Sequence, residues 1–374
     1  MVSIKTIIKI EFIYGFIIKC ILHFIGIFVK KDNNIWIFGQ LGGTEFSGNS
    51  KYLFLKVFKE HKNIRPIWFT KKKNIVKIIN SFNGEAYLIN SLEALYYGLI
   101  AKVYIHSYGR DDILNYSKIN AIFVNLYHGM ALKKLKQYFR RDDLDIASSE
   151  LTKEVRKKIF INTKKLIITG EPKYDMFYKK TDKISILKKY NLEKFHNQRI
   201  VTYLPTYRKE RRNFRPLFLN FNQFSELNDV VLFEKSHYID KESAINLSMD
   251  LKNIVNISNI GIDTQELLFI TDILITDYSS CFVDFLLRGN PIIFYVYDLE
   301  EYTKTQGFYY DYEEVTPGIK AYSELEVFQS IKKYLKNPDL DRDKRVKVKN
   351  MFHKYQDGNS SERVFHEIMK LLNK

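Results

Sequence analysis

The sequence is poor in cysteine and has no spacing typical of a metal site. Cys20 and Cys281 are the only two cysteines in 374 residues, too few for a disulfide framework, which indicates a reducing compartment. No cysteine or histidine spacing resembles a zinc site. Low-complexity segments and fixed-period repeats are also lacking, so a repeat architecture is not expected. What remains is a globular composition, 45% hydrophobic and 27% charged.

The length and the charge limit the number of domains and the kinds of partner. A chain of 374 residues is too long for one ordinary core and fits two domains. The net charge of +16 is typical of proteins that bind nucleic acid or anionic membranes. The chain is also rich in Lys, Ile, Asn, Phe and Tyr together, as AT-rich coding sequence would make it, so part of this basicity has no functional meaning. The local basic clusters carry more weight: Lys71 to Lys73, Lys133, Lys134 and Lys136, Arg140 and Arg141, and Arg208 to Arg215.

The N-terminal segment is the candidate membrane element. Residues 4–29 are mostly apolar but carry too many charges for a comfortable spanning helix, and they lack a small-residue cleavage site. On a helical wheel, Lys5, Lys9, Lys19 and His23 fall within one wedge of about 80°. A broad apolar face with a narrow basic stripe predicts an amphipathic helix over residues 1–31 that lies in the membrane interface. The alternatives are a helix packed on the first domain and a true membrane span.

Short apolar runs alternate with stretches of helical length along the rest of the chain. This pattern predicts an α/β fold, with parallel sheets covered by helices in two successive units. The expected strands are Ile35 to Gly39, Arg65 to Thr70, Val103 to His106, Ala121 to Tyr127, Leu166 to Gly170, Ile200 to Leu204, Val230 to Glu234, Ile273 to Thr276 and Ile292 to Val296. The polar stretch 179–198 predicts the linker, which gives domains of residues 32–180 and 181–374. The final helix is a candidate to pack back on the first domain.

Residues 273–302 contain the most informative local pattern. An apolar strand ends at Asp277, a polar turn with Ser279 and Ser280 follows, and then come an apolar helix and a second strand. The serines fall where a helix is expected to begin, and the free N–H groups and positive dipole end of a helix suit a phosphate. The simpler interpretation is that both serines only cap the helix.

Polar clusters follow four of the expected strands. In open α/β sheets, ligands bind outside the carboxyl ends of the strands. One cluster belongs to the first unit and the others to the second, so we expect them to face each other across an interdomain cleft. The clusters are Tyr127-His128-Gly129, Pro205-Thr206-Tyr207-Arg208, Lys235-Ser236-His237 and Tyr278-Ser279-Ser280.

Several longer motifs, in this order, resemble the CDP-glycerol glycerophosphotransferase family, the teichoic-acid primases and polymerases and their capsule-pathway relatives. They are Ser47 to Tyr52, Tyr127 to Leu135, Gly170 to Asp175, Leu204 to Arg208, Glu234 to His237, Thr276 to Tyr302, Gly307 to Tyr312, Pro317-Gly318 and Asp357 to Arg363. The resemblance implies a two-domain GT-B-type fold with Rossmann-like domains. It also implies a CDP-activated polyol donor and membrane-linked acceptors at the cytoplasmic face.

The resemblance also implies that two histidines carry the chemistry, and their motif positions match His128 and His237. The chain departs from the family pattern at three places. Tyr127 replaces a usual Trp, Tyr238 replaces a usual Pro, and the Gly-Tyr-Pro-Arg-like motif reads Gly170-Glu-Pro-Lys173. The change at Tyr238 puts substrate choice more than catalysis in doubt, because it frees the backbone and adds a side chain near the site.

The implied reaction is attack of an acceptor hydroxyl on the β-phosphate of CDP-glycerol, which releases CMP. His128 is the candidate base, because neutral imidazole can accept a proton near pH 7. Residues that stabilise or bind the phosphates complete the predicted site, and no metal or cofactor is expected. The predicted substrate-binding residues are Gly129, Lys133, Thr206, Arg208, Lys235, Ser236, Asp277, Tyr278, Ser279 and Ser280.

Other interpretations remain open for single residues and for the whole chain. Arg208 fits a surface ion pair equally well, and the histidines outside the motifs are expected to be structural. The donor could be CDP-ribitol or another nucleotide-linked polyol or sugar. The high charge alone would suit a nucleic-acid-binding protein, but that function does not need histidines at strand ends. A membrane scaffold with a decayed active site is disfavoured, because His128, His237 and both serines are present.

Overall fold

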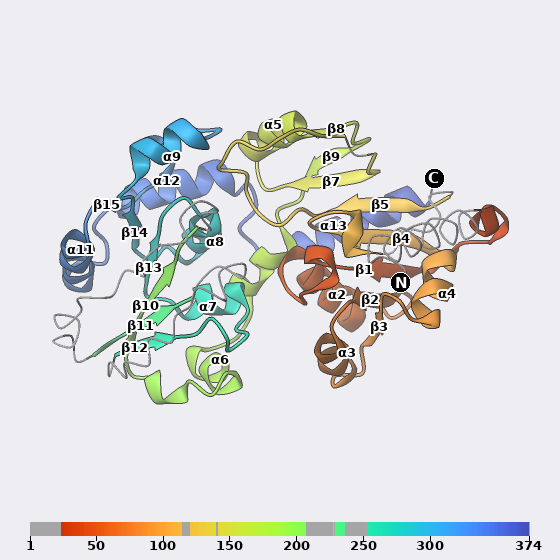
Figure 1. The fold of residues 1–374 in the computed structure, drawn as a ribbon, viewed down its shortest axis with the longest axis horizontal. Helices are drawn as coiled ribbons and strands as arrows, with labels where there is room; N and C mark the ends of the chain where they lie inside the picture. The colour runs from red at the N-terminus through yellow and green to blue at the C-terminus, as the bar shows by residue number, and fades with distance from the viewer. Residues whose placement is uncertain are drawn as a thin grey trace, which may run out of the picture.

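The chain forms two parallel β-sheets flanked by helices (Figure 1). The computed structural model describes residues 24–113, 120–139, 141–206, 227, 229–235 and 253–373. Within these ranges the first sheet has seven strands in the order β3-β2-β1-β4-β5-β7-β9. The second has six, in the order β12-β11-β10-β13-β14-β15. Neighbouring strands run parallel in both sheets, as the alternating sequence pattern predicts.

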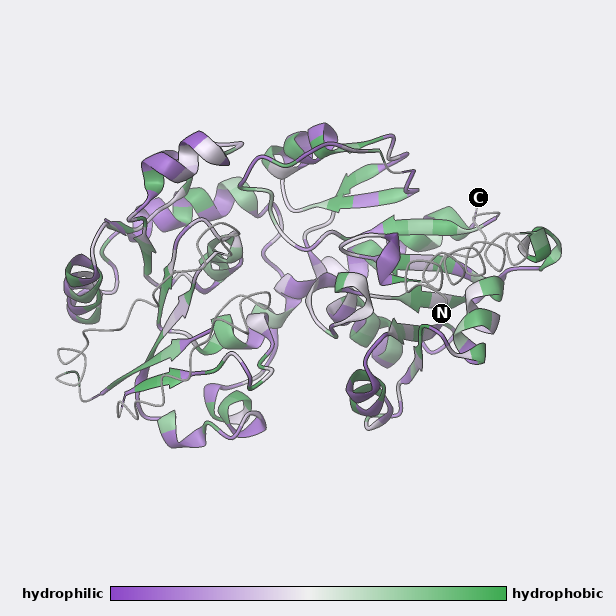
Figure 2. Cartoon of the chain, viewed as in Figure 1, coloured by the Kyte–Doolittle hydropathy of each residue, from purple (hydrophilic) through white to green (hydrophobic). Residues whose placement is uncertain are grey.

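The strands coincide with the apolar runs, which appear as hydrophobic arrows in Figure 2. A strand with helices on both faces of its sheet is buried on both sides, so it needs a near-continuous apolar run. The first sheet comprises β1 Asp32–Phe38, β2 Arg65–Thr70, β3 Glu85–Leu88, β4 Ala101–His106, β5 Ile122–Asn125, β7 Leu144–Ala147 and β9 Leu166–Ile168. The second comprises β10 Arg199–Leu204, β11 Val230–Glu234, β12 Ile254–Asn256, β13 Ile273–Thr276, β14 Ile292–Tyr295 and β15 Ile319–Ala321. The short strands β6 Tyr138–Phe139 and β8 Phe160–Ile161 pair separately.

The helices connect the strands and often begin at a residue that caps them. Ser149 caps α5 by accepting a hydrogen bond from the Thr152 N–H, and Asp263 caps α7. The described α-helices are α2 Gly48–Glu60, α3 Lys73–Asn80, α4 Leu92–Ile100, α5 Glu150–Ile159, α6 Lys183–Lys189, α7 Thr264–Ile270, α8 Cys281–Phe285, α9 Leu299–Thr305, α10 Tyr312–Val315, α11 Glu324–Lys336, α12 Arg342–Phe352 and α13 Ser360–Leu372. The short 3-10 helices are η1 Leu41–Gly43, η2 Arg110–Asp112, η3 Pro172–Tyr178, η4 Glu193–Phe195 and η7 Leu286–Arg288.

The last helix, α13, packs against the first sheet although it follows the second sheet in the sequence (Figure 1). Its residues Val364, Phe365 and Ile368 are buried in the same core as Trp36 of β1. The Asp175 carboxylate of η3 accepts the first two N–H groups of the helix, each at 2.8 Å. The chain therefore passes to the second unit beyond η3 and returns to the first between α12 and α13.

Every expected strand is present, but several short strands were not expected. β3, β7, β12 and β15 are only three or four residues long. The expected linker, residues 179–198, contains α6, whose Ile186 and Leu187 are buried in the core of the second unit. The domain boundaries at residues 31 and 180 stay predictions.

Most of the predicted amphipathic helix lies outside the described residues. Residues 24–28 are helical, and the side chains of Phe24 and Phe28 are 63% and 75% exposed. Among the helices that the structure describes, none combines the length and the apolar character needed to cross a bilayer.

Candidate active site

The loop after β5 carries His128 in an unusual backbone conformation. Tyr127 has φ 55°, and Gly129 has φ 156°, in the region that favours glycine. The His128 side chain reaches solvent, between the rings of Tyr108 and Tyr127, whose centroids lie 5.2 and 4.2 Å from its own. The residue predicted to be the base is therefore accessible to a substrate.

The surroundings of His128 favour a neutral ring with one free nitrogen. Its Nδ1 lies 3.4 Å from the Ser107 carbonyl oxygen, which can only accept a hydrogen bond. This contact places the proton on Nδ1 and leaves Nε2 as the acceptor. Although the ring reaches solvent, partial desolvation by the surrounding protein atoms, together with the charges of Lys173 and Arg156, lowers the pKa of His128. The ring is thus neutral near pH 7, as a general base requires.

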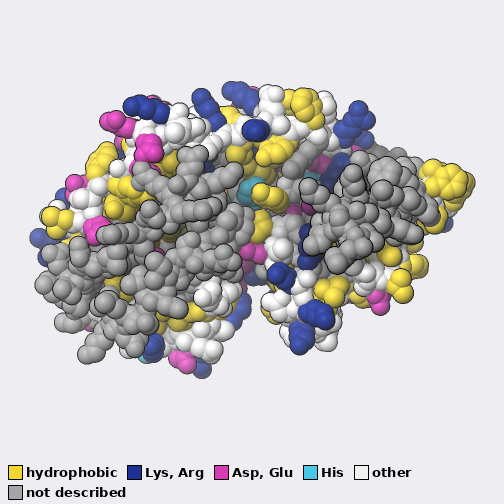
Figure 3. Space-filling view, in the orientation of Figure 1, with side chains coloured by type: hydrophobic (Ala, Val, Ile, Leu, Met, Phe, Trp, Pro, Cys, Tyr) yellow, Lys and Arg dark blue, Asp and Glu magenta, His cyan; other side chains and the backbone are white. Residues whose placement is uncertain are grey.

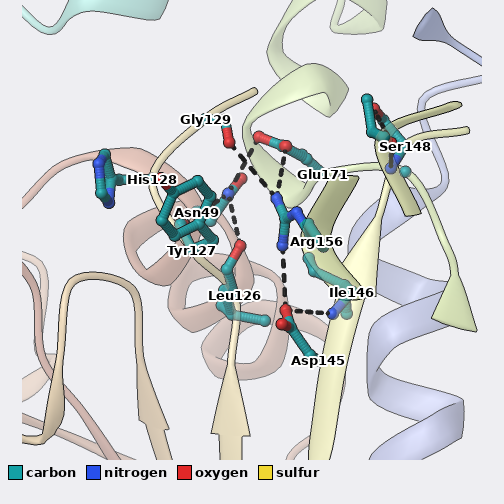
Figure 4. A network of polar contacts seen from close by, with 12 residues as sticks. Asn49, Leu126, Tyr127, His128, Gly129, Asp145, Ile146, Ser148, Arg156 and Glu171 are labelled. Atoms are coloured by element: carbon teal, nitrogen blue, oxygen red, sulfur yellow. Dashed lines mark hydrogen bonds and ion pairs between the residues drawn. The ribbon is translucent and has the colours of Figure 1, made fainter. Parts of the chain in front are cut away.

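A buried polar network lies beneath this loop (Figure 4). Arg156 of α5 donates to Asp145 of β7 at 3.0 Å and to Glu171 at 3.0 Å. Its guanidinium also donates to the Gly129 carbonyl at 3.5 Å and lies over the Tyr127 ring. Burial alone would lower the pKa of Arg156, but the two carboxylates raise it. The network therefore holds a charged guanidinium against the backbone of the His128 loop.

The network continues into the second unit through Lys173. The Lys173 ammonium lies 3.4 Å from Glu171 and donates at 2.7 Å to Asp284 of α8. Asp284 also accepts a hydrogen bond from Gln265 of α7 at 3.1 Å. Burial would lower the pKa of Lys173, but Asp284 and Glu171 raise it, so the ammonium stays charged. Charges of alternating sign thus run from β7 of the first sheet to α8 of the second unit.

The loops after β5 and β13 meet, as expected of polar clusters at strand ends. A Cβ atom built on Gly129 would lie 3.3 Å from the Ser280 Oγ and 3.7 Å from the Lys173 Nζ. Ser280 is the N-cap residue of α8, and the Ser279 Oγ accepts the Cys281 N–H at 3.4 Å. Any larger residue at position 129 would therefore crowd the serine turn.

Two predicted site residues in the turn after β13, Asp277 and Tyr278, are buried and bonded to the protein itself. The Asp277 carboxylate accepts the N–H groups of Thr206 at 2.8 Å and Tyr278 at 2.6 Å. The Tyr278 ring is fully buried and stacks on Tyr302, and its hydroxyl donates to Asp298 at 2.8 Å. These contacts fix the turn and bring the Thr206 backbone beside it.

Two of the remaining predicted residues, Lys133 and Lys235, lie among the described residues, and three do not. Lys133 lies in a segment that crosses to the second unit, where it pairs with Phe308 as an antiparallel bridge. Lys235 follows β11 and donates to the Ile262 carbonyl at 2.7 Å and to the Thr264 hydroxyl at 3.2 Å. Arg208, Ser236 and His237 lie outside the described residues, so their places in the site stay predictions. Within the described ranges, no group of three His, Cys, Asp or Glu side chains could hold a metal ion.

The two units are also joined by a buried ion pair. Lys51 of α2 donates to Asp263 at 2.7 Å, and the Tyr52 hydroxyl donates to the same carboxylate at 2.9 Å. Burial would raise the pKa of Asp263, but Lys51 and the hydrogen bonds lower it to about 2. Lys51 and Tyr52 belong to the motif Ser47 to Tyr52, whose place in the site sequence reasoning did not predict.

Sequence reasoning missed the residues that support the site from below: Asn49, Asp145, Arg156, Glu171, Lys173 and Asp284. Arg156 belongs to the run Arg156-Lys157-Lys158, and a basic run of this kind is expected on a solvent-exposed surface. Its side chain is nevertheless buried. One signal lay at Glu171 and Lys173, where the chain departs from the family pattern, and another lay in the motif Ser47 to Tyr52, which contains Asn49. Glu171 stands where the pattern has Tyr, and an added acid two residues from a base could have suggested an ion pair.

Comparison with known proteins identifies the family. Residues 21–370 match the family CDP-Glycerol:Poly(glycerophosphate) glycerophosphotransferase. The chain belongs to this family. The sequence-based expectations of the family and the transferase class are thereby confirmed. The expected GT-B-like fold is confirmed by solved structures of a wall teichoic acid polymerase that share it.

Relatives of this chain differ in length, and their names give different polyols. The chain is 29% identical to the teichoic acid poly(glycerol phosphate) polymerase of Bacillus spizizenii, over 98% of this chain and 99% of that one. It is also 29% identical to the teichoic acid ribitol-phosphate polymerase TarL of Staphylococcus aureus, over 56% of this chain and only 38% of the relative. The solved wall teichoic acid polymerase TagF shares the fold, with a TM-score of 0.81 and 21% identity over 98% of this chain and 97% of that one.

Proposed function

We propose that this chain transfers glycerol phosphate from CDP-glycerol to a hydroxyl group of a membrane-linked acceptor and releases CMP. The polymer would be teichoic-acid-like or capsular, and the reaction would take place at the cytoplasmic face of the cell membrane. One observation carries the proposal: in a member of this family, an accessible neutral histidine stands on a loop that meets a serine turn of the second unit. A lipid-linked saccharide or polyol phosphate is the acceptor class.

In the proposed step the acceptor oxygen attacks the β-phosphorus of CDP-glycerol. The new P–O bond forms as the bond between the β-phosphorus and the CMP oxygen breaks. The acceptor proton passes to Nε2 of His128, whose other nitrogen faces the Ser107 carbonyl. His237 is proposed to stabilise the pyrophosphate charge, with Lys235 and Ser236 beside it, and Arg208 with Thr206 to bind a phosphate. Lys133 would steer an anionic acceptor.

The serine turn is the proposed contact for a donor phosphate oxygen. The Ser280 hydroxyl lies beside Gly129, Ser279 precedes it in the turn, and both hydroxyl groups can donate to a phosphate oxygen. Asp277 and Tyr278 hold the turn from beneath, a positioning role that fits their burial. An anionic membrane surface is a further proposed partner, which the exposed Phe24 and Phe28 would contact.

CDP-ribitol is the second candidate donor. The equal identity of 29% to a glycerol-phosphate and to a ribitol-phosphate polymerase favours testing it directly. On the face drawn in Figure 3, the Lys and Arg side chains of the described residues lie scattered among acidic and hydrophobic ones.

The test is CMP release by purified protein with CDP-glycerol, CDP-ribitol or a UDP-sugar, each with lipid-linked acceptor and detergent. We expect turnover with CDP-glycerol. Turnover with CDP-ribitol alone would keep the transferase class but overturn the named donor. Turnover with the UDP-sugar alone would overturn polyol-phosphate transfer.

A further inference from the structure

Asn49 contacts the His128 loop more directly than any other residue of the motif Ser47 to Tyr52. It lies in the first turn of α2, and its side chain is completely buried. The amide nitrogen donates to the Leu126 carbonyl at 3.1 Å and to the Tyr127 carbonyl at 3.0 Å. These are the two carbonyl groups that precede His128 in the chain (Figure 4).

The same side chain joins this loop to the charged network. The Asn49 amide nitrogen also lies 3.2 Å from the Glu171 carboxylate, and the Asn49 oxygen accepts the Lys173 N–H at 3.2 Å. Glu171 pairs with Arg156, which reaches the Gly129 carbonyl. Carbonyl groups on both sides of His128, those of Tyr127 and Gly129, are therefore held by one connected set of buried side chains.

The backbone needs such support because its conformation is unfavourable for the residue that adopts it. Tyr127 has φ 55°, the left-handed region that non-glycine residues rarely occupy. Conformations of this kind persist only where the surroundings hold them, and they gather at functional sites. Without the Asn49 donors, two carbonyl groups would lose buried partners, and the loop would relax toward an ordinary conformation.

We propose that Asn49 is a positioning residue, which holds the Tyr127–Gly129 loop so that His128 stands correctly in the active site. The proposal rests on the proposed function, in which His128 is the general base. It assigns Asn49 no contact with the substrate. Its loss should therefore lower kcat and leave the KM for CDP-glycerol unchanged.

The variant Asn49→Ala tests this, with Thr202→Val as the matched control. Thr202 is equally buried, and its hydroxyl makes one buried hydrogen bond, to Thr271 at 2.6 Å in the second unit. We expect Asn49→Ala to lower kcat roughly 100-fold, as a small misplacement of a catalytic group does. Thr202→Val should keep kcat within about twofold of the wild type. Equal kcat losses in the two variants at matched thermal stability would overturn the proposal.

A double-mutant cycle separates positioning from a general loss of structure. If Asn49 acts only through His128, Asn49→Ala should not slow a His128→Ala enzyme further. A further loss as large as that in the wild type would overturn the proposal. The variant Asn49→Asp, which keeps the shape but removes both N–H donors, should behave like Asn49→Ala. Full activity of Asn49→Asp would show that the donors are not needed.

A structural readout does not depend on transferase activity. With 13C-labelled histidine, the His128 ring signal, assigned by its loss in His128→Gln, should move in Asn49→Ala and stay in place in Thr202→Val. An unmoved His128 signal would overturn the positioning role even if no donor is turned over. Inactivity of the wild type with every donor, together with a moved signal, would instead overturn the proposed function alone.

Discussion

The two loops that meet in the site are stabilised in different ways. The loop after β5, residues 126–129, rests on buried charges and amides from α2, α5, β7 and the turn before η3. The turn after β13, residues 277–280, rests on aromatic packing, with the Tyr278 ring among Tyr302, Phe308 and Tyr312. Its polar support includes the Asp277 carboxylate, which accepts two backbone N–H groups, and the Tyr312 hydroxyl, which donates to the Asp277 carbonyl at 2.9 Å.

This difference suits the two proposed tasks. A general base must stay within hydrogen-bond reach of one proton, so its loop needs directional contacts that fix its position. A turn that offers hydroxyl groups to a phosphate oxygen tolerates more freedom, and apolar packing is sufficient to hold it. We therefore predict that removing a polar side chain beneath His128 costs more free energy of unfolding than removing one beneath Ser280.

Removing the guanidinium beneath the first loop should have the largest effect on stability. Arg156→Met leaves Asp145 and Glu171 buried without their partner, and breaking a buried pair typically costs about 3–5 kcal/mol. Urea unfolding measures the loss. The control Arg65→Met breaks an exposed pair with Glu85, which is typically worth less than about 1 kcal/mol. Equal costs for the two variants would contradict the importance of the buried network.

The ion pair between Lys51 and Asp263 should make stability depend on pH at the junction of the two units. The pKa of Asp263 is lowered to about 2, so the pair stabilises the folded state above the unfolded pKa near 4. This contribution, roughly 2 kcal/mol by linkage, is lost as the pH falls from about 4 to about 2.

Comparing Lys51→Met with the wild type isolates this group. The variant should show a smaller loss of unfolding free energy between pH 5 and pH 2.5 than the wild type. The control Lys189→Met removes a more exposed partner of Glu266 and should leave the pH dependence unchanged. The same pH dependence in all three proteins would rule out the assigned role of Asp263.

Tyr278→Phe should have the smallest effect. It removes the hydroxyl that donates to Asp298 but keeps the ring in its aromatic cluster, so we expect a cost of about 1 kcal/mol. Tyr104→Phe, which loses a similar buried hydrogen bond to the Gly98 carbonyl in the first unit, is the control. CMP release should be nearly unchanged in both. A large loss of activity in Tyr278→Phe alone would mean that the hydroxyl contacts the substrate, in line with the sequence-based prediction that Tyr278 is a substrate-binding residue.

The sequence was sufficient to predict the sheets because apolar runs mark strands buried on both faces. It was insufficient for short strands such as β7, where Asp145 interrupts the apolar pattern and is buried only because Arg156 pairs with it. The loop of His128 and the turn of Ser280 were predictable because each follows the carboxyl end of a parallel strand, where ligands bind in open α/β sheets.

The supporting residues could not be predicted in the same way. Asn49 and Arg156 are ordinary residues of helices, and their importance comes from contacts with residues far away in the sequence. Asn49 is 77 positions from Leu126 and 122 from Glu171. No local pattern encodes such contacts. The motif Ser47 to Tyr52, which contains Asn49, had no assigned role and was the only indication that one existed there.

The most direct test of the account is to measure turnover and donor binding in the same preparation of His128→Ala. The proposed function makes His128 the base and gives it no part in holding the donor. We therefore predict that CMP release from CDP-glycerol falls roughly 100- to 10,000-fold, while calorimetry shows an unchanged Kd for CDP-glycerol. A variant that retains most of its turnover, or that loses donor binding along with it, would contradict the account.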